Sequence, residues 1–226
     1  LSRFQMLVYE KQDSLLNALK FNEVNGLADL TPKQLSEVDN KRYNVRSSAT
    51  QGGVYLLFNT ASEKLNTAKM RQAIRSGINT TELRENIGGK YLQELFTPII
   101  AETAQAIKPV FNVNTAKMYL DELGWKQTNN GTWKKGDEEL RLKIAVIKSP
   151  ELELAADEVV KQLNNLGIKT DTQILDLEDV DQGALQNILQ PRDFDILINK
   201  INIGADSDVY AYWHSSQANK NGLNFS

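Results

Sequence analysis

The stretch IGADSDVYAYWHSSQ, residues 203–217, gathers several side chains whose types could do chemistry. It holds the only histidine of the chain, His214, together with Trp213, two tyrosines and two aspartates. It directly follows the apolar run FDILINKIN, residues 194–202, which predicts a strand. Three kinds of site are compatible with these residue types: a nucleophilic triad, a metal site and a loop that recognises a ligand.

A nucleophilic triad would combine Asp206, His214 and Ser215, which are the residue types that serine hydrolases use. In this chain the histidine adjoins the serine in sequence, and no Gly-x-Ser-x-Gly turn surrounds the serine. The residue types are therefore present without the turn that exposes the nucleophile. We expect no enzyme activity, and a hydrolase that uses this loop stays open as an alternative from another class of protein.

A metal site would have only three ligands, Asp206, Asp208 and His214, and the chain contains no cysteine that could add a fourth. A lone histidine beside aromatic residues is more often a hydrogen-bonded packing residue. The acidic run DLEDVDQG, residues 176–183, lacks the register of a calcium loop and suits the start of a helix better. We therefore expect neither a metal nor another cofactor.

The overall composition narrows the class of partner. A formal net charge of -3 at pH 7, with basic residues scattered along the chain, gives no positive surface for a phosphate backbone, so nucleic acid is not an expected partner. No apolar run approaches the ~20 residues that would cross a bilayer. The absence of cysteine excludes disulfides and thiol catalysis. The chain starts and stops without the features of complete termini, so we interpret it as a piece of a longer protein.

The first half of the chain predicts strands and amphipathic helices in alternation. Residues 3–10 alternate apolar and polar positions, which predicts a half-buried strand, and Asp13 can cap the helix that follows. The run GVYLLFN, residues 53–59, is apolar on both faces and predicts a central strand. A helix capped by Asn66 or Thr67 comes next. The inward positions of this helix are Met70, Ala73, Ile74 and Ile78.

The second half predicts a helix from Asn114 that ends at Gly124, followed by a hairpin region at residues 125–140. Asn130 and Gly131 supply the positive φ angles that a tight turn needs. An alternating strand, a helix ended by Gly167 and the run IKTDTQI then form a parallel, right-handed βαβ unit. These elements predict an α/β fold with an open sheet.

The loop at residues 203–217 follows the carboxyl end of a predicted strand. In open α/β sheets, ligands bind beyond the carboxyl ends of strands. Trp213 lies in this loop with Tyr210 and Tyr212, which favours stacking against a ligand. The position of the loop therefore favours a binding function.

Four segments, in this order, resemble the extracellular solute-binding family 5 of ABC importers, which includes oligopeptide- and dipeptide-binding proteins. The segments are DSLLNALKFNEVNGLADLTPKQL (13–35), YLLFNT with AKMRQAIRSGIN (55–60 and 68–79), NTAKMYLDELGW (114–125) and FDILINKINIGADSDVYAYWHSSQANKNGLNFS (194–226). Asn79 and Asn25 replace acids that are usual in the family, and no proline follows Asp208. Family members are considerably longer and form two lobes around a cleft.

The resemblance implies a periplasmic-binding-protein-like type II lobe, with a mixed open sheet flanked by helices. The whole chain, residues 1–226, would be the second, C-terminal ligand-binding lobe of a two-lobe protein. It implies that this lobe binds oligopeptides for an ABC importer, works with the membrane permease subunits and is a monomer. It also implies an extracytoplasmic location, periplasmic or as a cell-surface lipoprotein. The alternative with the same fold is a non-peptide ligand, such as an oligosaccharide or a nickel chelate.

The resemblance also implies roles for particular residues. Asp206 would form an ion pair with the α-amino group of the peptide. The backbone of Asn202, Ile203 and Gly204 would pair with the extended ligand. Tyr55 and Asn59, at the end of another strand, would face the same cleft, and Trp213 is the candidate for stacking.

Overall fold

The computed structural model describes residues 3–9, 12–28, 30, 32–39, 41–46, 52–88, 111–179, 183–202, 208–219 and 221–226. Two compact units make up the chain, Leu1–Ser48 and Ala49–Ser226. The first unit contains the helices α1 (Gln12–Lys20) and α2 (Pro32–Ser36). The second unit contains the strands and the remaining helices, and it holds most of the residues predicted to bind a ligand.

In the first unit, the predicted helix is confirmed but the predicted strand is wrong. Helix α1 buries Leu16 and Leu19, and it begins at Gln12, so that Asp13 lies in its first turn rather than at the cap. Residues 3–9 form no strand, and Phe4 is 79% exposed. Alternation becomes a strand only when a neighbouring strand pairs with its backbone, and the described part of this unit contains no strand.

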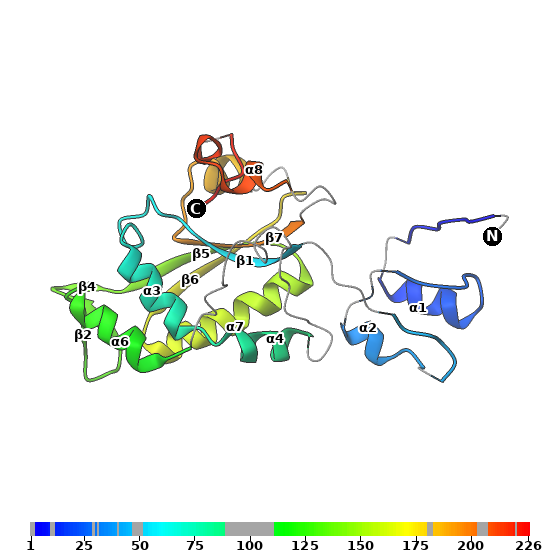
Figure 1. The fold of residues 1–226 in the computed structure, drawn as a ribbon, viewed down its shortest axis with the longest axis horizontal. Coiled ribbons are helices and arrows are strands. Elements are labelled where there is room, and N and C mark those ends of the chain that lie inside the picture. The colour runs from blue at the N-terminus through cyan, green and yellow to red at the C-terminus, as the bar shows by residue number, and fades with distance from the viewer. Residues whose placement is uncertain are drawn as a thin grey trace. The chain divides into compact units, whose positions relative to one another are not determined.

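A four-stranded mixed sheet forms the centre of the second unit (Figure 1). The strands lie in the order β1 (Gly52–Phe58), β7 (Ile196–Asn202), β5 (Arg141–Ile147) and β6 (Lys169–Leu175). Strand β1 is antiparallel to β7, whereas β5 is parallel to both β6 and β7. The predicted mixed open sheet and the parallel pairing of the βαβ unit are thus confirmed.

Strand β1 lies at an edge of this sheet, so the prediction of a central position is wrong. Among the described strands it pairs only with β7. Both faces of β1 are nevertheless covered, because Leu56 and Phe58 pack against one hydrophobic cluster and Leu57 belongs to another. Apolar residues on both sides of a strand indicate that both of its faces are buried. They do not show whether the strand lies in the centre or at the edge of the sheet.

One face of the sheet carries the helices α3 (Ala68–Gly77), α4 (Thr80–Gly88), α6 (Val113–Glu122) and α7 (Pro150–Leu166) (Figure 1). The hydroxyl of Thr67 caps α3 by accepting a hydrogen bond from the Met70 backbone at 3.2 Å. Helix α6 is capped by Asn112, slightly before the predicted start, and ends before Gly124 (φ 87°). Helices α3, α6 and α7 confirm the predictions from periodicity, whereas α4 was not predicted.

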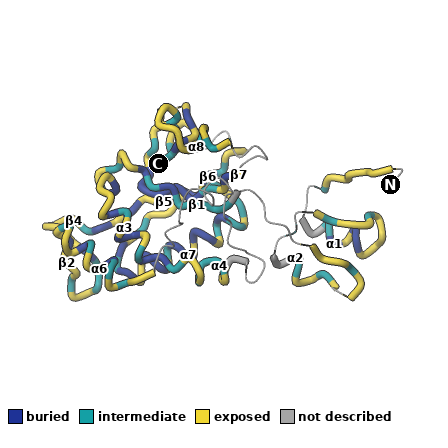
Figure 2. Tube along the Cα trace, viewed as in Figure 1, coloured by how far each residue is buried: buried dark blue, intermediate teal, exposed yellow. Residues whose placement is uncertain are grey.

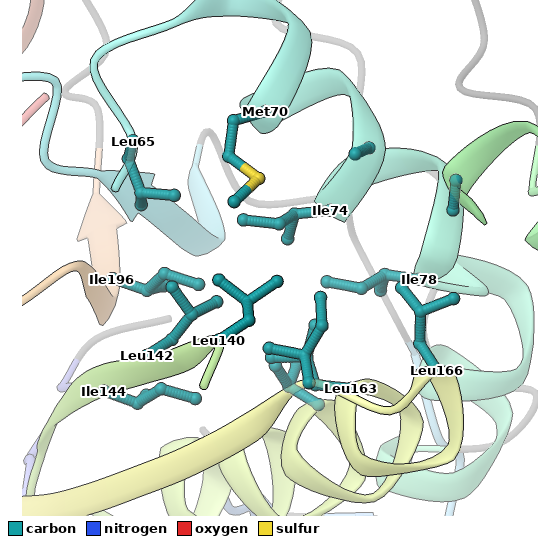
Figure 3. Packing of buried hydrophobic residues seen from close by; sticks show 14 of the residues in the cluster. Leu65, Met70, Ile74, Ile78, Leu140, Leu142, Ile144, Leu163, Leu166 and Ile196 are labelled. Atoms are coloured by element: carbon teal, nitrogen blue, oxygen red, sulfur yellow. The ribbon is translucent and has the colours of Figure 1, made fainter. Parts of the chain in front are cut away.

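The large hydrophobic core lies between these helices and the sheet. Figure 3 shows Met70 and Ile74 of α3 facing Leu140, Leu142 and Leu163. Leu140, Leu142 and Leu163 have no exposed surface. Burial of each such side chain contributes about 1.5–3 kcal/mol. The periodic apolar residues of the sequence therefore hold the helices to the sheet.

A small antiparallel sheet of β2 (Lys126–Gln127), β3 (Trp133–Lys135) and β4 (Glu138–Glu139) forms the predicted hairpin region. Gly131 has φ 81°, as predicted, whereas Asn130 has no positive φ. The Trp133 indole donates a hydrogen bond to the Leu166 carbonyl at 2.9 Å. This bond fastens the small sheet to the end of α7.

The opposite face of the main sheet carries a short π-helical turn (Leu185–Leu189), α8 (Tyr210–Trp213) and a 3₁₀ turn (Ser215–Ala218). The acidic run at residues 176–183 precedes this π-helical turn, and residues 180–182 of the run lie outside the described residues. Figure 2 shows the buried residues concentrated on the strands and on the inner side of α7. In the described residues, no helix combines the length and apolar character that a membrane span requires.

Candidate functional site

The candidate site surrounds the carboxyl end of β7. Strand β7 ends at Asn202, whose side chain is exposed. The predicted ligand-binding residues Ile203, Gly204 and Asp206 lie outside the described residues. The described chain resumes at Asp208, whose carboxylate accepts a hydrogen bond at 2.8 Å from the backbone of Tyr210, the first residue of α8.

Tyr55 and Trp213 are brought together by the fold. Tyr55 lies within β1, and Trp213 is the last residue of α8. Their rings meet edge to face, with centroids 5.6 Å apart and planes at 73°. Trp213 keeps 48% of its surface exposed and also meets Tyr212 at 6.0 Å. Burial raises the pKa of the Tyr55 hydroxyl above its ordinary value. Together the two rings form a partly exposed aromatic surface.

The side chain of His214 makes its contacts with residues close to it in the sequence, Tyr210 and Ser216. Its ring stacks on Tyr210, with centroids 4.4 Å apart, and its Nδ1 accepts a hydrogen bond from the Ser216 backbone at 3.2 Å. The Ser216 hydroxyl lies 2.9 Å from both the His214 Nδ1 and the Tyr210 hydroxyl. The histidine therefore pairs with Ser216 and not with Ser215, the serine that the triad hypothesis required. The interpretation as a hydrogen-bonded packing residue is confirmed.

The residues proposed for a metal site do not form one in the described part of the chain. No group of three or more His, Asp or Glu side chains comes together among the described residues. Asp208 lies close to Tyr210 in sequence and bonds to its backbone, while the His214 Nδ1 is occupied by Ser216. Asp206, the third candidate ligand, falls outside these residues.

Asn59 lies at the opposite end of the β1–β7 pair from Asn202. In the antiparallel register, Phe58 is opposite Ile196, whereas Gly52 is opposite Asn202. Seven strand residues span about 20 Å, so the two asparagines lie far apart along the strand pair. The register therefore separates two residues that were expected to face the same cleft.

The Asn59 side chain is buried and bound to the backbone. Its amide nitrogen donates hydrogen bonds to the Arg192 carbonyl at 3.1 Å and the Phe194 carbonyl at 2.9 Å. Its amide oxygen accepts one from the Ala61 backbone at 3.1 Å. Asn59 thus holds the end of β1 to the turn that precedes β7.

A second buried polar residue next to Asn59, Asp195, was not predicted. Its carboxylate accepts hydrogen bonds from the Ser62 hydroxyl and from the Lys143 backbone, the latter at 2.8 Å. The Lys64 ammonium lies 3.7 Å away. The sequence did contain a signal for this residue, because Asp195 lies inside the apolar run FDILIN. A carboxylate that is buried with such a run needs a hydrogen-bond or charge partner.

An open hollow of about 380 Å³ lies at the β5–β6 side of the sheet. Its lining residues are Lys143, Ile144, Ala145, Asp171, Thr172, Gln173, Asp193 and Phe194. The hydrogen bond from Lys143 to Asp193, 2.6 Å long, raises the pKa of the lysine. None of the predicted ligand-binding residues lines this hollow, and its charged groups already pair with each other or with Arg141.

The mixed open sheet flanked by helices is the architecture predicted for a periplasmic-binding-protein-like lobe. A family model described as "Bacterial extracellular solute-binding proteins, family 5 Middle" matches residues 1–222. The chain belongs to this family of solute-binding proteins. The resemblance found in the sequence motifs is therefore confirmed.

Individual relatives agree with this assignment. The oligopeptide-binding protein AppA of Bacillus subtilis (strain 168) is 28% identical over 182 residues, which cover 76% of this chain and 32% of AppA. The structure of B. subtilis AppA with a nonapeptide has a TM-score of 0.72 at 22% identity, over 96% of this chain and 44% of that one. Brucella suis NikA with Fe(III)-EDTA has a TM-score of 0.78 at 19% identity, with 96% and 44% covered.

At these identities, the two solved structures establish the fold and not the ligand. The chain spans less than half the length of each of these relatives.

Proposed function

We propose that this chain is the C-terminal ligand-binding lobe of a solute-binding protein that captures oligopeptides for an ABC importer. The contact between Tyr55, which lies opposite Asn199 of β7, and Trp213 of α8 is the observation that carries the proposal. A half-exposed indole braced by a second ring offers a rigid apolar surface for the side chains of a bound peptide. AppA, the relative that shares 28% identity, is named an oligopeptide-binding protein.

Asp206 is proposed to bind the α-amino group of the peptide. In the sequence it stands between β7 and α8, and in this proposal its carboxylate pairs with the N-terminus of the bound peptide. A hydrogen bond between charged groups contributes about 1.5–3 kcal/mol. The backbone of Asn202, Ile203 and Gly204 is proposed to pair with the peptide backbone, which explains how many sequences could be accepted.

The protein is proposed to return its ligand unchanged to the membrane permease subunits of the importer. Closure of two lobes around a ligand is a change of shape that such subunits can recognise. We infer an extracytoplasmic location, either periplasmic or as a cell-surface lipoprotein, and a monomeric state. No catalytic step is part of this function.

Titration calorimetry of Asp206→Ala in the full-length protein tests the role of the carboxylate. We expect binding of peptides with a free amine to weaken about 10-fold or more, because an ion pair is lost. Binding of N-acetylated peptides should change little. Asp157→Ala, at an exposed acid of α7 on the other face of the sheet, is the control for loss of one negative charge, and thermal unfolding checks that both variants are folded. Equal losses for free and acetylated peptides would reject the proposed contact.

Native mass spectrometry of the purified full-length protein tests the ligand class. We expect co-purified species with peptide masses. The solved relatives include NikA with Fe(III)-EDTA and Campylobacter jejuni NikZ with Ni(L-His), so a metal chelate is the ligand that this measurement must distinguish from peptide. A co-purified chelate or oligosaccharide would contradict the peptide proposal.

A further inference from the structure

Arg192 occupies a strained position in the turn before β7. Its φ is 60°, a left-handed conformation that residues other than glycine rarely adopt. The buried amide of Asn59 donates a hydrogen bond to the Arg192 carbonyl at 3.1 Å, which helps to hold this backbone conformation. A strained residue that the surrounding structure holds in place is a reason to look for a role of its side chain.

The Arg192 side chain reaches the end of the chain rather than a carboxylate. Its Nη2 donates a hydrogen bond to the Asn219 carbonyl at 3.0 Å, and its guanidinium carbon lies 5.0 Å from the centroid of the Phe225 ring. Within the described part of the chain Arg192 takes part in no ion pair. Burial lowers the pKa of its guanidinium. The desolvated charge is therefore offset by a carbonyl and an aromatic face.

The chain that Arg192 contacts is bound together internally. We call residues 208–219 and 221–226 the C-terminal segment. In it, the Asn224 side chain donates a hydrogen bond to the His214 carbonyl at 3.3 Å, and the Asn224 backbone donates to the Gln217 carbonyl at 3.1 Å. Gly222 lies so close to the Gln217 carbonyl that no Cβ would fit. A contact that holds one part of the C-terminal segment therefore restrains the rest of the segment as well.

The contacts of Arg192 with the C-terminal segment also restrain Trp213, one member of the aromatic pair. His214, which Asn224 binds, directly follows Trp213 in sequence. Phe225 packs against Phe194, with centroids 6.4 Å apart, so that the end of the segment lies on the start of β7. Contacts to Arg192 and Phe194 therefore hold the C-terminal segment to the residues that precede β7.

We propose that Arg192 is a positioning residue: its guanidinium fastens the C-terminal segment to the turn before β7 and so holds Trp213 against Tyr55. A planar guanidinium can donate to a carbonyl and stack on a ring at the same time, which suits the two contacts of this site. An effect of Arg192 on ligand binding rests on the function proposed above. Its effect on the position of Trp213 is independent of that function.

Fluorescence quenching by acrylamide tests this proposal without a ligand. Trp125 and Trp133 are only 7% and 3% exposed, so the quenchable signal of the 226-residue chain comes from Trp213, and Trp213→Phe measures the remainder. Arg192→Gly and Arg192→Asn keep residues that tolerate positive φ but remove the guanidinium. Because Trp213 is already 48% exposed, its release should raise the quenching constant at most about twofold.

Arg71→Gln is the matched control, because the Arg71 guanidinium also donates to a backbone carbonyl, that of Leu65, at 2.7 Å. This arginine belongs to α3, on the other face of the sheet, so its loss should leave the quenching of Trp213 unchanged. Unchanged quenching in both folded Arg192 variants would overturn the proposal. So would a rise that occurs only together with the unfolding of the whole chain, followed by circular dichroism.

Peptide titrations of the same Arg192 variants in the full-length protein separate the two proposals. Higher quenching together with weaker peptide binding supports both the positioning role of Arg192 and the proposed contact between Trp213 and the ligand. Higher quenching with unchanged peptide binding supports the positioning role of Arg192 and contradicts the proposed contact between Trp213 and the ligand.

Discussion

The ring of Trp213 meets the ring of Tyr55 edge to face at 5.6 Å, although one belongs to α8 and the other to β1. Such a contact contributes about 0.5–1.5 kcal/mol beyond the area that it buries. Tyr55 also packs against the hydrophobic cluster of Leu197 and Ile201, on the face of the sheet that α8 covers. The candidate aromatic surface is therefore anchored on the sheet by Tyr55.

Tyr55→Phe should change how stability depends on alkaline pH. Burial raises the pKa of Tyr55, so the folded state favours the protonated hydroxyl. The resulting contribution to stability is complete below the ordinary tyrosine value of about 10 and is lost as the pH rises through the raised value. Urea unfolding from neutral to alkaline pH should show the original protein losing stability faster than Tyr55→Phe. Parallel curves for the two proteins would contradict this.

Asn59→Ala should destabilise the second unit, because two backbone carbonyls would lose a buried donor. Unsatisfied buried groups cost about 1–3 kcal/mol each, and the measurement is the free energy of unfolding in urea. Asn59→Asp should be worse, since it places a carboxylate against the Arg192 and Phe194 carbonyls. The exposed Asn114→Ala is the control, with a change within about 0.5 kcal/mol. Similar small effects at both positions would show that the Asn59 hydrogen bonds contribute little.

Glu158→Gln should remove an acid-sensitive contribution to stability. Burial raises the pKa of this carboxylate, but hydrogen bonds from Gln162, Lys161 and Asn86 together outweigh that effect, so its pKa is lowered. The contribution is present above the ordinary glutamate value and is lost as the pH falls through the lowered value. We expect the variant to be less stable at neutral pH and the difference to shrink in acid. A difference that stays constant between pH 7 and acid would contradict the assignment.

The local sequence predicted the helices and several strands well. In α7, Leu152 to Leu166 repeat at helical spacing, Ser149 accepts a hydrogen bond from the Leu152 backbone at 3.2 Å, and Gly167 adopts φ 92°. The alternation from Leu142 to Val146 likewise became β5. These signals are reliable because neighbouring residues in the chain decide them.

The sequence predicted parts of the candidate site but not their arrangement. Trp213 and Tyr55 were singled out separately, and nothing local showed that they touch. Asn59 and Asn202 were expected in one cleft, and the antiparallel register puts them at opposite ends of the pair. Arg192 carried no sequence signal, since its role depends on Asn219 and Phe225, which lie far along the chain.

By itself, the sequence determined most of the helices and strands of the second unit, which family the chain belongs to, and which residue types are available for binding. The tertiary structure decided that β1 lies at the edge of the sheet, that residues 3–9 form no strand, and that Trp213 meets Tyr55. The physical reason is the range of the forces. Periodicity and capping act between residues a few positions apart, whereas strand order and side-chain meetings depend on pairing between distant segments.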